Sequence, residues 1–204
     1  MRKRGDLVLV TRPQPGAAET ARRLAALGHH PLIAPLLRIQ PSAPRLPPSA
    51  AVQAVLATSA NALPALAGHL GCRLLVVGDA TAARARDAGF ADIHSAGRDA
   101  AALAALVAGR CDPAGPPLLL AAGAGQGRAL AAALRAAGFT VLRRTAYAAR
   151  PVAALDPMAL AALQAGEVAA ALFFSAATAR AFIDLLGAAL PVSAVARVEA
   201  LALS

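Results

Sequence analysis

Short apolar runs alternate with amphipathic stretches along most of the chain. The runs are apolar at consecutive positions, which is typical of parallel strands that are covered on both faces. Nine strands are predicted, at Leu7–Val10, Pro31–Ala34, Ala54–Thr58, Leu74–Val77, Asp92–Ser95, Leu118–Ala121, Thr140–Arg143, Ala170–Phe174 and Glu199–Leu203. Helical patterns separate them, and repeated strand–helix units predict an α/β fold with parallel sheets.

The ends of the predicted helices carry recognisable capping residues. Glycines in positions that end helices are Gly28, Gly89, Gly138, Gly166 and Gly187. N-cap side chains are expected at Asp99, Ser175 and Asp156, the last with Pro157 at the first helical position. The helix from Ser175 is expected to turn Phe182, Ile183 and Leu186 toward the core.

An internal repeat divides the chain into two similar halves. The segment Leu7–Ile39 reads strand, loop, helix, glycine and strand, and Leu118–Arg150 repeats this plan. Val52–Gly71 aligns in the same way with Val168–Gly187, which places Ser59 opposite Ser175. Two copies of one α/β plan predict two similar lobes rather than a solenoid.

Two extended, proline-containing stretches, Leu36–Pro48 and Thr145–Val152, have the character of crossings between the lobes. We therefore expect a first lobe from residues 1–36 and 153–204, linker strands at 37–48 and 145–152, and a second lobe at 49–144. The middle of the chain would then be inserted into a lobe that is built from its two ends.

Composition and patterning favour a soluble, cytoplasmic protein. The hydrophobic fraction of 58% and the mean hydropathy of +0.57 reflect alanine more than membrane segments. The longest apolar stretch, Val168–Ala196, is interrupted by Arg180 and Asp184, which makes it a poor spanning helix. Only Leu7–Val10 follows the basic start, which is too short for a signal peptide. The two cysteines lie far apart, and we expect reduced thiols.

The formal net charge of +9 favours an anionic partner. Only 3% of residues are aromatic and no basic run exceeds three residues, so a nucleic acid is disfavoured. A polyanionic small molecule is the better candidate. The alternative explanation of the positive charge is the composition of the source organism's proteins, because an alanine- and arginine-rich proteome would give the same excess of arginine.

The carboxyl ends of the predicted strands carry small hydroxyl residues and glycines. Ligands of open parallel sheets bind at these ends, and free N–H groups at helix starts bind carboxylates or phosphates. The residues in this position are Arg12, Ser59, Gly78, Ala80, Thr81, Ser175 and Thr178. Each of the hydroxyl residues alone is explained as well by helix capping, and it is their recurrence in both lobes that favours binding.

Other catalytic signatures are weak. Gly123–Gly127 resembles a phosphate loop but lacks the Gly-Lys-Ser/Thr ending of a P-loop and does not fit the dinucleotide fingerprint. His29 and His30 have no third ligand at metal-like spacing. The eleven carboxylates are scattered, without a paired acid–base signature.

Five segments in order resemble the uroporphyrinogen-III synthase family: LVLVTRPQPGAAETARRLAALGHHPLIAPLLRIQP, AVLATSANAL, LLVVGDATAARARDAGF, AGFTVLRRTAYAARP and ALFFSAATARAF. The resemblance covers essentially the whole chain. It implies two flavodoxin-like parallel-sheet lobes joined by a two-stranded linker, with the ligand between them. The implied substrate is hydroxymethylbilane, a polycarboxylated linear tetrapyrrole. Loss of its hydroxyl and a spiro intermediate invert ring D and give uroporphyrinogen III.

The resemblance also assigns roles to residues. Tyr147 corresponds to the family tyrosine, a candidate donor to the departing hydroxyl. Arg12 corresponds to the Thr-Arg-Pro arginine, Thr81 to the Gly-x-x-Thr threonine, and Ser59 and Ser175 to the strand-end serines. No metal or organic cofactor is implied, and we expect a monomer.

One departure from the family pattern concerns the end of the chain. The family continues beyond Leu201–Ser204 with a further turn, helix and strand–helix unit, so we expect the last strand–helix unit to be missing here. Two alternatives stay open. The first is a non-catalytic, two-lobed binder of anionic small molecules, which would depend on Arg12 rather than Tyr147. The second, a receiver-like domain, needs an acidic cluster that these strand ends lack.

Overall fold

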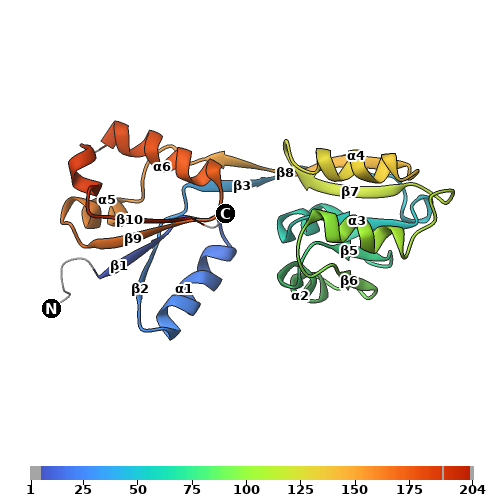
Figure 1. Cartoon of the computed structure of the whole chain (residues 1–204), viewed down its shortest axis with the longest axis horizontal. Helices are drawn as coiled ribbons and strands as arrows, with labels where there is room; N and C mark the ends of the chain where they lie inside the picture. The colour runs from blue at the N-terminus through green and yellow to red at the C-terminus, as the bar shows by residue number, and fades with distance from the viewer. Residues whose placement is uncertain (1–5, 190, 203–204) are drawn as a thin grey trace. The chain divides into compact units, whose positions relative to one another are not determined.

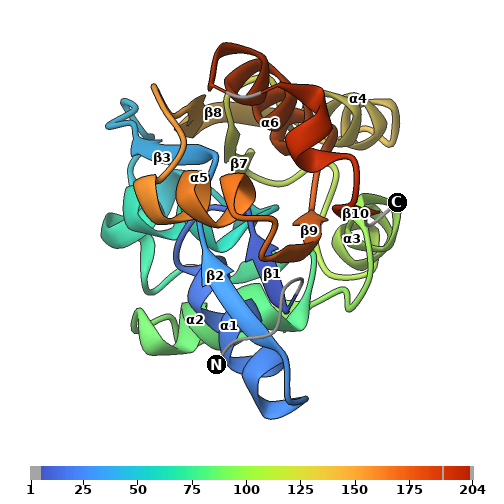
Figure 2. The same ribbon diagram turned by 90° about the vertical axis from the view of Figure 1, so that its left-hand side faces the viewer.

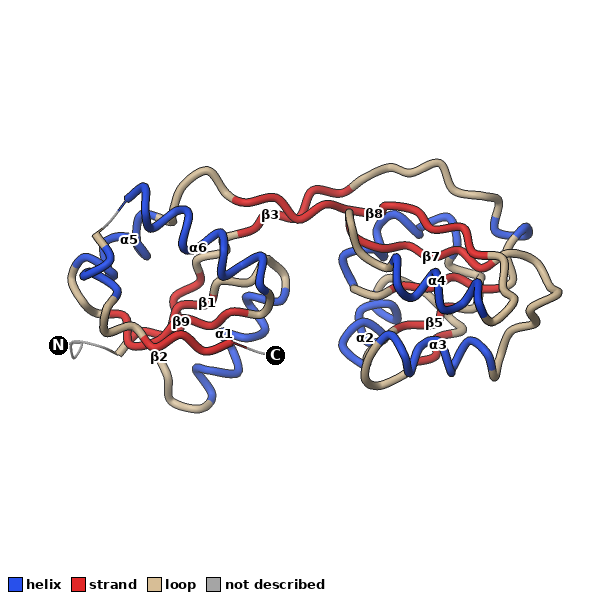
Figure 3. Tube along the Cα trace, turned by 45° about the horizontal axis from the view of Figure 1, so that its top comes forward, coloured by secondary structure: helices blue, strands red, loops and turns tan. Residues whose placement is uncertain are grey.

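The computed structural model describes residues 6–189 and 191–202. The chain forms two compact units, which we call unit 1 (Met1–Ile39 with Ala149–Ser204) and unit 2 (Gln40–Ala148). The chain passes from one unit to the other twice, within β3 (Leu37–Pro41) and within β8 (Val141–Pro151), as Figure 3 shows.

The crossing strands β3 and β8 run antiparallel. The N–H of Val152 donates to the carbonyl of Leu36 at 3.0 Å, and the N–H of Ser42 donates to the carbonyl of Ala146 at 2.9 Å. Residue numbers therefore rise along one strand as they fall along the other. The first of these pairs lies in unit 1 and the second in unit 2.

Unit 1 contains a parallel four-stranded sheet in the order β10-β9-β1-β2. Its strands are β1 (Leu7–Val10), β2 (His30–Ile33), β9 (Val168–Phe173) and β10 (Glu199–Ala202). Helix α1 (Gly16–Ala26) covers one face, and α5 (Pro157–Gln164) and α6 (Ala176–Ala189) cover the other, as Figure 1 and Figure 2 show. A short 3-10 turn, η3 (Val192–Val195), precedes β10.

Unit 2 contains a six-stranded sheet in the order β3-β8-β7-β4-β5-β6. Besides the crossing strands it has β4 (Ala54–Ala57), β5 (Leu74–Val76), β6 (Ile93–Ser95) and β7 (Leu118–Gly123), and β8, β7, β4, β5 and β6 pair in parallel. Its helices are η1 (Ser49–Ala51), η2 (Ala60–His69), α2 (Asp79–Asp87), α3 (Ala100–Ala108) and α4 (Arg128–Ala136). Side chains of α3 and α4 pack with β4, β5 and β7 in one buried cluster.

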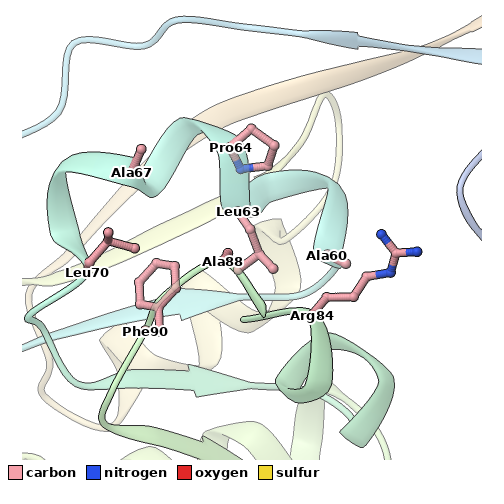
Figure 4. A pocket seen from close by; sticks show the side chains of 8 residues that line it. All are labelled: Ala60, Leu63, Pro64, Ala67, Leu70, Arg84, Ala88 and Phe90. Carbon is pink, nitrogen blue, oxygen red and sulfur yellow. The ribbon is translucent and has the colours of Figure 1, made fainter. Parts of the chain in front are cut away.

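The surface of unit 2 has an open apolar hollow between η2 and α2, drawn in Figure 4. Its lining is almost entirely aliphatic and aromatic, with Leu63, Leu70 and Phe90 among the side chains, and Arg84 lies at its edge. The hollow therefore offers little to a carboxylated ligand, and the polar strand ends described below are the better candidates.

The predicted α/β class is confirmed, with two sheets that are parallel except where β3 pairs with β8. All nine predicted strands form, and their ends lie within three residues of the predicted ends except in β8, which continues to Pro151. Leu203, the predicted end of the last strand, lies outside the described residues. The side chains of Asp99 and Asp156 accept N-cap hydrogen bonds as expected. Four of the five predicted capping glycines have positive φ: Gly28, Gly89, Gly138 and Gly166.

Two expectations for the C-terminal helix were wrong. Gly187 does not end a helix, because α6 continues to Ala189. Ile183 is 68% exposed, whereas Phe182 and Leu186 are buried. Phe182 and Leu186 are four positions apart and share a face, but Ile183 is turned about 100° from Phe182. The ring of Phe182 packs against Phe173 of β9 with centroids 5.3 Å apart, which fixes this rotation of α6.

In the part of the chain that the structure describes, none of the helices is long and apolar enough to span a membrane.

Candidate functional site

Each sheet has a point where the strand order reverses, and the candidate residues lie at the carboxyl ends of the strands at that point or of the strands next to it. In unit 1, β2 lies on one side of β1 and β9 on the other, so the loops after β1 and β9 diverge. In unit 2 the corresponding neighbours are β4 and β7. Such switch points are the usual ligand sites of open parallel sheets.

Arg12, which follows β1, is held by three neighbours. Its guanidinium carbon lies 4.4 Å from the centre of the Phe174 ring, and Nη1 donates to Oγ1 of Thr20 at 3.4 Å. A Cβ atom at Gly16 would lie 2.6 Å from the guanidinium, so the bare backbone of Gly16 makes the space for it. Within residues 6–189 and 191–202, no carboxylate forms an ion pair with Arg12. The side chain is therefore oriented while its charge stays available.

Thr11 joins the two strands at this switch point. It is fully buried, and its hydroxyl donates to the carbonyl of Leu172 in β9. This bond fixes the end of β1, and with it Arg12, against the end of β9, which leads into Phe174. Sequence reasoning identified Arg12 but missed Gly16, Thr20 and Phe174, since their role is a contact across strands that no spacing in the sequence reveals.

Ser175 and Thr178 form the start of α6. Their hydroxyl oxygens lie 2.7 Å apart, and the N–H of Thr178 donates to Oγ of Ser175 at 3.2 Å. Ser175 is exposed, whereas Thr178 is only 1% exposed. The predicted N-cap at Ser175 is thus confirmed, and the hydroxyl of Thr178 is turned inward onto the cap.

Two strand ends of unit 2 offer polar groups at helix starts. Ser59 is the N-cap of η2, and its Oγ accepts from the N–H of Asn61 at 3.3 Å. Gly78 is the N-cap of α2 and brings no side chain to the first-turn amides, which include that of Ala80. Among the described residues, the hydroxyl of Thr58, beside Ser59, is buried without a hydrogen-bond partner. Such donors suit an anionic ligand.

Thr81 is half-buried in the first turn of α2, where its N–H donates to the carbonyl of Gly78 at 3.0 Å. It thus lies at the carboxyl end of β5, one strand away from Ser59.

Tyr147 lies on β8, opposite Gly123 at the end of β7. It is only 4% exposed, and its hydroxyl donates to Oε1 of Gln126 at 3.0 Å. A Cβ atom at Gly123 would come within 2.8 Å of Cζ of Tyr147. The phenol ring is therefore packed against the backbone of Gly123, and its hydroxyl lies at the glycine-rich turn after β7.

The structure brings the predicted residues into two groups, one in each unit. Unit 1 holds Arg12, Ser175 and Thr178, and unit 2 holds Ser59, Gly78, Ala80, Thr81 and Tyr147. Sequence reasoning did not connect Gln126 with Tyr147, although it singled out the glycine-rich run that contains Gln126.

The described residues contain no group of three or more His, Cys, Asp or Glu side chains arranged to hold a metal ion. Cys72 and Cys111 are both free. Burial raises the pKa of the Cys72 thiol; burial also raises the pKa of the Cys111 thiol, with the Arg73 guanidinium partly opposing it.

The fold and these groups define a class: a two-unit α/β protein with arginine, hydroxyl and glycine residues at the strand ends of both sheets. The family model for uroporphyrinogen-III synthase HemD matches residues 18–204. The chain therefore belongs to the uroporphyrinogen-III synthase family.

Solved structures with a similar fold include the uroporphyrinogen-III synthetase from Helicobacter pylori. The two structures match with a TM-score of 0.63 and 17% sequence identity, and the match covers 97% of this chain and 83% of that one. A mutant uroporphyrinogen III synthase from the extremely thermophilic bacterium Thermus thermophilus has a TM-score of 0.52 and 24% identity, covering 97% of this chain and 84% of that one. The comparison with curated proteins gave no match.

Proposed function

We propose that the protein is a uroporphyrinogen-III synthase, a lyase that cyclises hydroxymethylbilane to uroporphyrinogen III with inversion of ring D and loss of water. The observation that carries this proposal is the family match over residues 18–204. The residues at the strand ends support it, because they suit the substrate and the reaction.

Carboxylate binding is the first task of the site, because the linear tetrapyrrole carries many carboxylates. In unit 1, Arg12 offers an oriented guanidinium whose charge is not used by an ion pair within the described residues. A guanidinium binds a carboxylate through two parallel N–H donors. The first turn of α6, after Ser175, adds backbone amides.

In unit 2, amide and hydroxyl donors have the same task. The first-turn amides of α2 follow Gly78, and Thr81 belongs to this turn. Ser59 and the unpartnered hydroxyl of Thr58 lie at the end of the neighbouring strand β4. Among the described residues no such hydroxyl comes with a histidine–acid pair at hydrogen-bond distance, so binding rather than nucleophilic attack is the role we assign to them.

Tyr147 is the candidate proton donor. Loss of the substrate hydroxyl as water needs one proton, and a phenol can supply it to the departing oxygen. Its hydroxyl donates to Gln126 at 3.0 Å, and rotation about the Cζ–O bond redirects that proton. The leaving group departs readily from a pyrrole-substituted carbon, so a strong base is unnecessary. Orientation of the resulting cation toward the spiro route is then the main catalytic effect.

We also propose that the enzyme is a cytoplasmic monomer without an organic cofactor. The two free cysteines agree with a reducing compartment. Light scattering on the purified protein checks the monomer: a particle near the 20.3 kDa of one chain is expected, and a dimer would contradict it.

The test of the function is an isomer assay. Freshly generated hydroxymethylbilane is given to the protein, the products are oxidised, and the uroporphyrin isomers are separated. Without enzyme the bilane closes to isomer I. We expect isomer III to predominate, and a folded protein that yields only isomer I would contradict the proposal and leave an anion-binding protein.

A further inference from the structure

We propose that Gln126 is a positioning residue for Tyr147 and that the glycine-rich run Gly123–Gly127 exists to hold it there. This inference rests on the proposed function and gives a role to a motif that the function itself does not use.

The contact between the two side chains is a single, well-formed hydrogen bond. The hydroxyl of Tyr147 donates to Oε1 of Gln126 at 3.0 Å. Tyr147 is only 4% exposed, whereas Gln126 is exposed. The phenol is therefore fixed by packing around its ring, and the direction of its hydroxyl is fixed by a residue on the surface of the turn.

The turn that carries Gln126 is held at several points. The N–H of Ala124 donates to the carbonyl of Tyr147 at 2.8 Å, and the N–H of Gln126 donates to the carbonyl of Gly123 at 2.9 Å. The carbonyl of Gln126 accepts from Nη1 of Arg143 at 3.0 Å. One of these bonds links the turn directly to the backbone of Tyr147, so the turn and the tyrosine are fixed relative to each other.

Each of three glycines meets a separate steric need. Gly125 and Gly127 have φ values of 75° and 73°, which L side chains rarely adopt. At Gly123 a Cβ atom would lie 2.8 Å from both Cζ of Tyr147 and Oε1 of Gln126. Gly123 thus makes the space in which the two side chains meet. The run resembles a phosphate loop in composition, but its geometry serves this contact.

The first test compares two substitutions of one residue with a matched control. Gln126→Leu removes the acceptor, and Gln126→Glu keeps one of the same size. Gln164→Leu repeats the first change at an exposed position in the last turn of α5, which precedes the amino end of β9, whereas the candidate residues of unit 1 follow the carboxyl ends of its strands. We expect Gln126→Leu to lower kcat for isomer III at least about tenfold with KM nearly unchanged, because misplaced catalytic groups cost rate. Gln126→Glu should recover most of the loss, and Gln164→Leu should behave as wild type.

The second test is spectroscopic and independent of activity. The chain has one tyrosine and no tryptophan, so Tyr147 is the sole source of tyrosine signals. The tyrosine Fermi doublet in the Raman spectrum consists of two bands. The intensity of its higher-frequency band relative to its lower-frequency band is low when the hydroxyl donates a hydrogen bond. We expect this ratio to rise in Gln126→Leu and to stay near the wild-type value in Gln126→Glu.

A double-mutant cycle separates positioning from a direct role. If Gln126 acts through Tyr147, Gln126→Leu costs no further rate in a Tyr147→Phe background. A full additional loss there would overturn the proposal, as would a Gln126→Leu variant with unchanged or faster turnover. A wild-type protein that makes only isomer I would overturn the proposed function and this role together, whereas an active wild type with an equally active Gln126→Leu variant overturns this role alone.

Discussion

The guanidinium of Arg12 lies over the ring of Phe174, with 4.4 Å between the guanidinium carbon and the ring centre. Arg12 follows β1 and Phe174 follows β9, so the contact spans the point in unit 1 where the strand order reverses. A stacked arginine keeps its N–H edge free for a carboxylate, and stacking on an aromatic face restricts the motion of the side chain.

Replacement of Arg12 by lysine should weaken substrate binding although the charge is kept. Lysine cannot stack on Phe174 or bind a carboxylate through two parallel donors. We expect Arg12→Lys to raise KM roughly tenfold with kcat little changed, in line with the about 1.5–3 kcal/mol of a hydrogen bond to a charged group. Arg22→Lys, an exposed change on α1, is the control. Equal KM values for the two variants would remove Arg12 from the binding site.

Gly16 offers a test of the same contact through its steric space. A Cβ atom there would lie 2.6 Å from the Arg12 guanidinium, which is the flexible end of a side chain and can move away. We expect Gly16→Ala to raise KM by displacing Arg12 while leaving the melting temperature nearly unchanged, because Gly16 is the first residue of α1, where alanine is readily accommodated.

The control for Gly16→Ala is Gly68→Ala, since a Cβ at Gly68 meets nothing within 4 Å. Steady-state kinetics and thermal melts on both variants are the measurements. A Gly16→Ala variant with wild-type KM would mean that the orientation of Arg12 does not matter.

Removal of the Tyr147 hydroxyl should slow turnover with little loss of fold. The ring stays packed on Gly123 in Tyr147→Phe, and only the bond to Gln126 is lost, which costs about 1 kcal/mol of stability. A positioned general acid contributes about 10²–10⁴-fold, so we expect kcat to fall by about 10²-fold. The isomer assay and a thermal melt measure the two effects. Unchanged kcat would exclude Tyr147 as the proton donor.

Much of the fold was predictable because it depends on local patterns. Leu118–Ala121 and Val168–Phe173 are apolar at consecutive positions, as doubly covered strands require. The rotation of α6 was not predictable, because the exposure of Ile183 follows from how Phe182 packs on Phe173. Tertiary contacts of this kind leave no periodic signal.

The candidate site was predictable only in part, for the same reason. Arg12 and Ser175 follow strands and are visible in the sequence. The partners that orient the functional groups, Phe174 for Arg12 and Gln126 for Tyr147, come from other strands or turns. Their pairing depends on which strands are neighbours in the sheet, and a single sequence does not specify that order.

The two thiols should make stability depend on pH in the alkaline range. Burial raises the pKa of Cys72 and of Cys111, so the folded state keeps its thiol protons to higher pH than the unfolded chain does. The unfolding free energy should therefore fall as the pH rises from the usual thiol pKa through the raised values. Urea titrations at neutral and alkaline pH, on the wild type and a Cys72→Ser/Cys111→Ser variant, measure this. The variant should lose less stability, and an equal loss in both proteins would contradict the raised pKa values.

Substitutions should show that Ser175 contributes to substrate binding and that Thr178 has a structural role. The hydroxyl of Thr178 lies 2.7 Å from that of Ser175, and the residue is only 1% exposed, so it supports the cap rather than meeting solvent. We expect Thr178→Val to lower the free energy of unfolding by about 1 kcal/mol with KM unchanged. Ser175→Ala should cost a similar amount through the lost cap and should also raise KM, because Ser175 is exposed at the strand end. Thr140→Val, on an exposed site, controls for the substitution itself. A Thr178→Val variant with raised KM and unchanged stability would return Thr178 to the substrate-binding residues.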